Sequence, residues 1–151
     1  MTARSADRTT LRLRAFVPFR LNRLAGAVSE HLAASYRERF ALEVPEWRVI
    51  ATVGQERDST AQFIAESTRM HKTRVSRAIA HLIKRGLIER AASPLDRRAM
   101  PLRLSGAGKR LYAQIVPLAL AREQELLNCM SARDRRAFLG ALSRLESHLK
   151  L

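Results

Sequence analysis

Residues 72–84, KTRVSRAIAHLIK, combine an apolar helical stripe with basic and hydroxyl side chains. At 100° per residue the stripe consists of Val75, Ala78, Ile79, Leu82 and Ile83, which predicts a helix packed on a core. The opposite arc carries Thr73, Arg77, Ala80 and Lys84, with Arg74 and Ser76 at its edges. Arginine forks match guanine edges in a major groove, and hydroxyls bond phosphates or bases. The alternative is a solvated amphipathic helix with no ligand.

The segment after this reading helix (72–84) predicts a two-stranded ribbon with a basic tip. Gly86 ends the helix as its C′ residue, and strand-like residues 87–90 and 101–104 flank a turn-rich loop. The loop carries Asp96, Arg97 and Arg98. Arginines on such a wing suit a narrow minor groove, and the acid can brace one of them or Arg77. A basic hairpin after a basic helix favours DNA binding over a solvated face.

The elements before the reading helix complete a winged helix-turn-helix. A helix over 45–53 is expected to end at Gly54, with Trp47, Ile50 and Val53 inside. Asp58 or Ser59 is expected to cap the next helix, whose Ala61, Ile64 and Ala65 face the reading helix, and 67–70 forms the turn. The residues expected to contact DNA are Ser59, Thr60, Thr68, Arg69, His71, Lys72, Thr73, Arg74, Ser76, Arg77, Lys84, Arg90, Asp96, Arg97 and Arg98.

The two ends of the chain predict further helices. A first long helix is expected from Pro18 to about residue 40. Ser105 is expected to cap a helix that runs to about 128, kinked at Pro117, and Ser131 caps a last helix with Phe138, Leu142, Leu145 and Leu149 on one face. These faces need a partner, which predicts a two-fold dimer. The fold class is mainly α with a small β-hairpin wing: an arm (1–17), a dimerisation region (18–44 and 105–151) and a DNA-binding domain (45–104).

The charge of the chain supports a polyanionic partner. The net charge is +14, and residues 59–104 alone hold ten basic and three acidic side chains. An anionic membrane surface is the alternative, but no helix joins a basic face to exposed Trp or Phe. No apolar run approaches about 18 residues, and the Arg-rich beginning lacks the apolar core of a signal peptide. We therefore expect a cytoplasmic, nucleoid-associated protein.

Catalysis and metal binding have little support in the residue pattern. The four histidines lie in separate segments without ligand spacing, and no Gly-rich phosphate loop precedes a helix. Ser76 near His71 or His81 lacks an acid and an oxyanion site. Cys129 is the only cysteine and is expected to be a buried helix residue, with a redox-sensing thiol as the alternative. We expect no enzyme, no metal and no cofactor.

The motifs together resemble the MarR family of bacterial transcription regulators. The resemblance rests on PEWRVIATVG, MHKTRVSRAIAHLIKRGLIER, PLDRR and LRLSGAGKRLYAQIVPLA, and it covers about residues 18–149. Within them, 75–77 resembles the recognition-helix core, 96–98 the wing signature, and 104–108 the strand-to-helix junction. His71 departs from the family's frequent Asp, and Ser105 from its usual Thr. The opening PFRLNRLA is similar to members that control hydroxycinnamate and other aromatic-acid breakdown.

The resemblance implies an obligate homodimer on a pseudo-palindromic operator, usually as a repressor, although activation stays open. It also implies a pocket between the first, second and fifth helices of the family for a small aromatic carboxylate or its coenzyme A thioester. The alternative is an effector-independent DNA-binding or architectural protein of the same fold. The candidate pocket residues are Phe16, Phe19, Arg20, Arg23, His31, Trp47 and Arg48. The competing interpretation is core packing for Phe19 and Trp47, a solvated face for Arg20 and Arg23, and a surface or interface position for His31.

Overall fold

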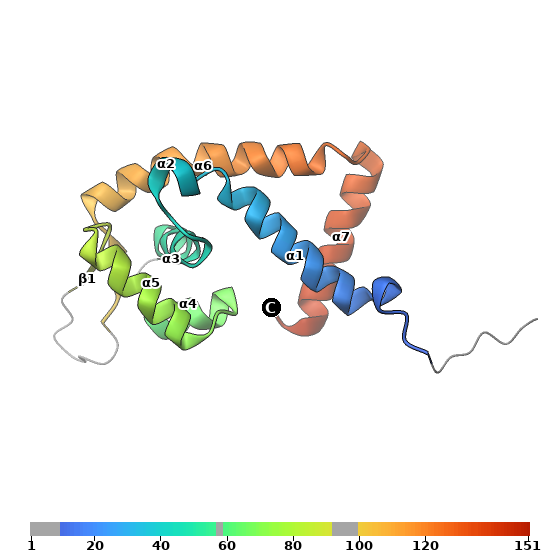
Figure 1. Ribbon diagram of the computed structural model, residues 1–151, viewed down its shortest axis with the longest axis horizontal. Helices are drawn as coiled ribbons and strands as arrows, with labels where there is room; N and C mark the ends of the chain where they lie inside the picture. The colour runs from blue at the N-terminus through green and yellow to red at the C-terminus, as the bar shows by residue number, and fades with distance from the viewer. Residues whose placement is uncertain (1–9, 57–58, 92–99) are drawn as a thin grey trace, which may run out of the picture.

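The computed structural model describes residues 10–56, 59–91 and 100–151, so the expected cap Asp58 and the wing residues Asp96, Arg97 and Arg98 lie outside the described residues. Figure 1 shows α6 running along one edge of the molecule, from the wing to α7. The elements are η1 (Leu13–Ala15), α1 (Val17–Ala33), α2 (Arg37–Phe40), α3 (Val44–Gln55), α4 (Ala61–Thr68), α5 (Lys72–Lys84), β1 (Ile88–Arg90), β2 (Leu102–Leu104), α6 (Gly106–Leu127) and α7 (Ala132–Leu149). The expected fold class, helices with a small hairpin, is confirmed.

The core lies where α3, α4 and α5 pack together beneath the hairpin. Val75, Ala78, Ile79 and Leu82 of α5 are buried, as their spacing predicts. Ile83 is 36% exposed and lies at the edge of the stripe. Trp47, Ile50 and Val53 are buried on α3, and Ile64 and Ala65 on α4, whereas Ala61 is exposed at the start of α4. The core also includes Tyr36, Leu42 and Ile115 from outside residues 45–104, and its contacts with α5 fix which side of that helix is exposed.

The first helix is shorter than expected, because the chain turns after Ala33. Ser35 and Tyr36 donate backbone hydrogen bonds three residues back, to Leu32 and Ala33, which tightens the end of α1. The turn places Tyr36 in the core, with its ring centroid 5.6 Å from that of Trp47. The separate helix α2 follows. The start of the first helix differs only slightly from the prediction, since Val17 precedes Pro18.

The second predicted helix, α3, continues one residue past Gly54. A Cβ on Gly54 would lie 2.9 Å from Cε2 of Tyr112 on α6, so glycine here lets the two helices approach rather than ending the first. The next helix, α4, is capped by Thr60, whose hydroxyl accepts a hydrogen bond from the Phe63 amide at 3.1 Å. The expectation that Ser59 is the cap is wrong.

The hairpin and its two helix junctions follow the prediction closely. Gly86 has φ +67°, and the Leu87 amide donates to the Leu82 carbonyl at 3.0 Å, as in a Schellman motif. The strands pair antiparallel with Ile88 opposite Leu104. Ser105 caps α6 by accepting from the Gly108 amide, also at 3.0 Å. The base of the wing is therefore anchored between the ends of α5 and α6.

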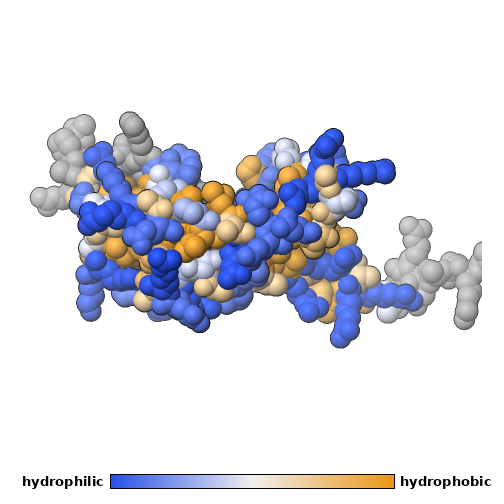
Figure 2. Space-filling model, turned by 90° about the horizontal axis from the view of Figure 1, so that it is seen from above, coloured by the Kyte–Doolittle hydropathy of each residue, from blue (hydrophilic) through white to orange (hydrophobic). Residues whose placement is uncertain are grey.

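The first half of α6 packs on the core through Ile115, whereas the end of α6 and all of α7 extend beyond it. Pro117 lies inside α6, and Ser131 caps α7 by accepting from the Asp134 amide, as expected. Cys129 is exposed in the turn between these helices, so the expectation of a buried helix cysteine is wrong. No residue of α7 is buried. Figure 2 shows apolar side chains reaching the surface on the side of the molecule that carries α7; the large ones on α1, α6 and α7 are Val17, Leu21, Leu24, Leu120, Leu126, Phe138, Leu139, Leu142, Leu145 and Leu149.

Candidate nucleic-acid interface

The exposed face of α5 is basic along its whole length. Its apolar stripe holds the helix on α3 and α4, which leaves the other side to solvent. Each residue predicted for that side is exposed: Lys72, Thr73, Arg74, Ser76, Arg77 and Lys84. None of the four cations forms an ion pair with a carboxylate of the described residues. The described part of this face therefore presents unpaired positive charge and hydroxyl groups on one straight element.

The N-terminus of α5 is capped by an unusual residue. The Nδ1 atom of His71 accepts a hydrogen bond from the Thr73 amide at 3.2 Å. This geometry requires an unprotonated Nδ1, so the cap depends on the ring tautomer. The Arg74 and Val75 amides both donate to the His71 carbonyl, at 2.9 and 3.1 Å. The exposed Lys72 side chain is therefore the main group that this end of α5 offers to a phosphate.

The segment before α5 contributes fewer groups than predicted. Ser59 is only 2% exposed, and its hydroxyl donates to the Glu56 carbonyl at 3.0 Å. Its carbonyl accepts from the Leu102 amide of β2, so Ser59 belongs to the base of the wing, and its predicted DNA contact is wrong. Thr60 and Thr68 are half-buried and already bonded within α4. Arg69 is exposed in the turn, with φ +55°.

The wing contributes one predicted residue within the described part of the chain. Arg90 is exposed on β1, opposite Leu102 of β2. The other three predicted wing contacts are those outside the described residues. The described interface is therefore the exposed face of α5, the turn at Arg69 and the end of β1.

The candidate effector residues lie in separate places rather than in one pocket. Trp47 is 9% exposed and stacks between Tyr36 and Tyr112, which confirms core packing for its ring. The Arg48 guanidinium donates to the Ser29 hydroxyl at 3.1 Å. His31 Nε2 lies 4.0 Å from a carboxylate oxygen of Glu125, on α6.

The remaining candidates lie on or beside the beginning of α1. Arg20 and Arg23 line a hollow of about 580 Å³ whose other walls include Val17, Leu21 and Leu24. The Arg23 guanidinium carbon lies 5.6 Å from the centroid of the Phe19 ring. Phe16, the N-cap residue of α1, is 42% exposed. This end of α1 thus combines cations with an apolar floor.

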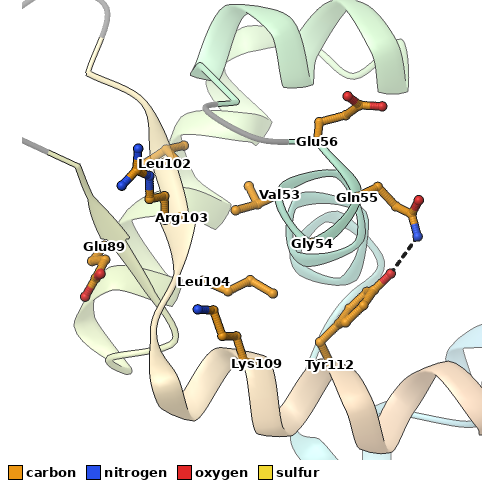
Figure 3. Close-up of a pocket in the computed structure, with 10 residues that line it drawn as sticks. All are labelled: Val53, Gly54, Gln55, Glu56, Glu89, Leu102, Arg103, Leu104, Lys109 and Tyr112. Carbon is orange, nitrogen blue, oxygen red and sulfur yellow. Dashed lines mark hydrogen bonds between the residues drawn. The ribbon is translucent and has the colours of Figure 1, made fainter. Parts of the chain in front are cut away.

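A larger hollow, of about 710 Å³, lies at the base of the wing and contains no predicted site residue (Figure 3). It is formed by the end of α3, by β2 and by the first turns of α6. The Gln55 amide donates to the Tyr112 hydroxyl at 2.9 Å across its rim, and Lys109 extends from α6 at its other side. No local pattern indicates it, because the end of α3 is far in the sequence from the continuous segment of β2 and α6 that forms most of the other walls.

In the ranges 10–56, 59–91 and 100–151, no three His, Cys, Asp or Glu side chains gather closely enough to hold a metal ion. No helix within those ranges has the length and apolar content needed to cross a membrane.

Comparisons with known proteins agree with this geometry. Residues 42–99 match the model of the MarR family. The transcriptional regulator HosA of Escherichia coli O157:H7 is 22% identical over 136 residues, which are 90% of this chain and 97% of HosA. A MarR/EmrR family regulator from Acinetobacter sp. ADP1 shares the fold with a TM-score of 0.82 at 23% identity, over 93% of this chain and 99% of its own. The regulator SPO1453 from Silicibacter pomeroyi DSS-3 gives 0.80 at 26% identity, with the same coverage.

The chain has the fold of MarR family transcriptional regulators of known structure. Its segment 42–99 also matches the sequence model of that family. The family resemblance is thereby confirmed, and the aromatic-acid branch stays a prediction. These relatives are regulators and not enzymes, in agreement with the absence of a catalytic pattern in the sequence.

Proposed function

We propose that the protein is a homodimeric transcription regulator that binds a pseudo-palindromic operator and represses the adjacent genes in the bacterial cytoplasm, at the nucleoid. The observation that carries this proposal is the exposed basic face of α5, whose four cations pair with no carboxylate of the described residues, within a MarR-type fold. In this proposal residues 45–104 read DNA, and the segments 18–44 and 105–151 form the dimer. Arg77 supplies base contacts, whereas Lys72, Arg69, Arg90 and the wing arginines bind the phosphate backbone.

The dimer is supported by the apolar surface of the chain ends. The 18-residue helix α7 contains no buried residue, so none of its side chains is fully covered by the described part of its own chain. Phe138, Leu142, Leu145 and Leu149 follow one face of α7, and exposed leucines lie on α1 and α6 as well. A two-fold arrangement would bury all three surfaces at once. It would also place two α5 helices about 34–36 Å apart, as successive major grooves require.

The effector we propose is a small aromatic carboxylate or its coenzyme A thioester. The Mycobacterium tuberculosis MarR family protein Rv2887 shares this fold at a TM-score of 0.72 and 20% identity, and its structure is a complex with salicylic acid. In the present chain, Arg20 and Arg23 line the hollow at the beginning of α1, and the Arg23 guanidinium carbon lies 5.6 Å from the centroid of the Phe19 ring. A guanidinium beside apolar and aromatic side chains suits a carboxylate on an aromatic ring.

Binding of the full chain to the DNA that flanks its own gene tests the proposal. We expect a specific shift that an aromatic acid, or its thioester, relieves at a concentration that does not unfold the protein. Arg77→Ala should weaken operator binding by about 1–3 kcal/mol and relax base preference. Arg136→Ala on α7 removes the same charge far from α5 and serves as the matched control.

The outcomes separate the parts of the proposal. If Arg77→Ala and Arg136→Ala bind alike, α5 is not the reading element. Tight binding that no compound relieves favours an effector-independent or architectural protein of the same fold. Binding without preference between the flanking DNA and unrelated DNA of equal length would contradict sequence-specific regulation.

A further inference from the structure

The C-terminal end of α5 is fixed to a corner of the chain that is distant in sequence. The Arg85 guanidinium donates two hydrogen bonds, from Nη1 to the Ala41 carbonyl and from Nη2 to the Phe40 carbonyl, both at 2.8 Å. These carbonyls lie at the end of α2, where Ala41 has φ +49° and the helix leaves its last carbonyls without helical partners. A planar fork meets two acceptors at once, which fixes orientation as well as distance.

A second contact joins the same end of α5 to the beginning of α3. His81 Nδ1 is hydrogen-bonded to Oε1 of Glu46, and the other carboxylate oxygen accepts from the Glu43 amide at 2.8 Å. Glu46 is only 7% exposed, so its carboxylate is a buried group with two partners. One side chain therefore completes the capping box of α3 and holds the reading helix.

The corner is in turn joined to the first helix. Arg37 donates from Nη1 to Glu30 of α1 at 3.1 Å and from Nε to Glu43 at 3.2 Å. The hydrogen bond with Glu30 raises the pKa of Arg37, and Glu43 acts in the same direction. Figure 1 shows α2 at the point where α1 ends and the chain turns towards α3. Polar contacts thus run from α1 through residues 37–46 to the end of α5.

We propose that residues 37–46 are the joint that sets the angle between α5 and the dimerisation helices α1, α6 and α7. Arg85 and Glu46 are its positioning residues. This inference rests on the proposed two-fold reading of DNA. Neither side chain needs to touch DNA. Each acts by holding the end of α5 to a corner that follows directly from α1, so the separation of the two α5 helices in the dimer depends on both.

Operator spacing provides the test. We would measure binding of the full-length dimer to its operator, to operators with one base pair added or removed between the half-sites, and to a single half-site. Arg85→Gln should reduce the discrimination between native and altered spacing by about three- to tenfold, with half-site affinity unchanged. Arg85→Lys, which keeps the charge and one donor direction, should give an intermediate loss. Arg136→Gln, which changes an exposed arginine of α7 outside the joint, is the matched control.

Glu46→Gln provides an independent variant, because its amide oxygen can still accept from the Glu43 amide while the charge beside His81 is lost. It should reduce spacing discrimination in the same direction. A purely structural defect would lower the active fraction and weaken binding to all four DNAs equally. If the wild-type protein discriminates between spacings and Arg85→Gln and Glu46→Gln discriminate as strongly, the proposed joint is wrong but two-fold reading of DNA stands. A parent that binds every spacing equally would contradict two-fold reading, and the joint with it.

Discussion

At the scale of single residues, Tyr36 shows how one buried side chain ties stability to pH. Its side chain is 1% exposed, and burial raises its pKa from 10.0 to about 12, against the lowering effect of Arg37 and Arg48. Between these values the unfolded chain loses the phenolic proton and the folded chain keeps it. The folded state then binds more protons, so stability falls as pH rises. The contribution is complete below pH 10 and is lost towards pH 12.

Tyr36→Phe should therefore flatten the alkaline decline in the free energy of unfolding. Phenylalanine keeps the ring in its stack with Trp47 but has no proton to lose. Urea unfolding at successive pH values across the window, for parent and variant, measures the difference between the two slopes. Parallel pH dependences would show that Tyr36 does not carry the effect.

At the scale of elements, the junction between the wing and α6 depends on a close backbone approach. A Cβ on Gly108 would lie 1.9 Å from the Leu87 carbonyl oxygen, which also accepts from the Ser105 amide at 3.1 Å. Ser105 donates its hydroxyl proton to the Gly86 carbonyl as well. The first turn of α6 is thus pressed against the chain that leaves α5, and only glycine fits there.

Gly108→Ala should destabilise the fold by about 1–3 kcal/mol, because α6 must move away from the hairpin. Gly106→Ala is a matched control in the same helical turn: its Cβ would meet nothing nearer than the Arg110 guanidinium at 3.6 Å. The control should be neutral or more stable by about 0.4–1 kcal/mol. Chemical denaturation compares the two, and equal stabilities would contradict the close approach.

Elements whose limits are set by neighbouring residues were predictable from the sequence. The stripe of α5, the turn at Gly86 and the cap at Ser105 are of this kind. The break after Ala33 was not predictable, because the helix ends in order to bury Tyr36 against Trp47, a contact between separate segments. The same distinction applies to the site. The basic face of α5 lies on one element, whereas Arg85 meets carbonyls 44 and 45 residues earlier in the chain.

At the scale of the whole molecule, the apolar ends of the chain decide its state of association. Leu142 is 38% exposed near the middle of the α7 stripe. Burying the part of such a side chain that is still exposed is worth roughly 1 kcal/mol, a two-fold interface buries it twice, and a lysine there would also place a charge in the interface. Leu142→Lys should therefore raise the dissociation constant of the dimer by more than about tenfold.

Sedimentation at several protein concentrations would measure this change in association. Ser147→Lys adds the same charge to the opposite face of α7 and should leave the dimer intact. The hydrophobic core contains no residue of α7. Both variants should therefore keep the near-ultraviolet circular dichroism signal of the buried Trp47. A dimer unaffected by Leu142→Lys would mean that the stripe faces solvent in the assembled protein.

The core that supports α5 contains no residue of α7, and the apolar stripe of α7 is exposed. This separation has a genetic consequence. If pairing depends on the chain ends while DNA reading depends on α5, a chain with a damaged α5 still pairs with an intact one. Each such mixed dimer has only one intact α5, and it takes up an intact chain that would otherwise form a dimer able to bind both half-sites of the operator. Loss-of-function alleles in α5 should thus be dominant over the wild type, whereas alleles that truncate the chain before α7 should be recessive.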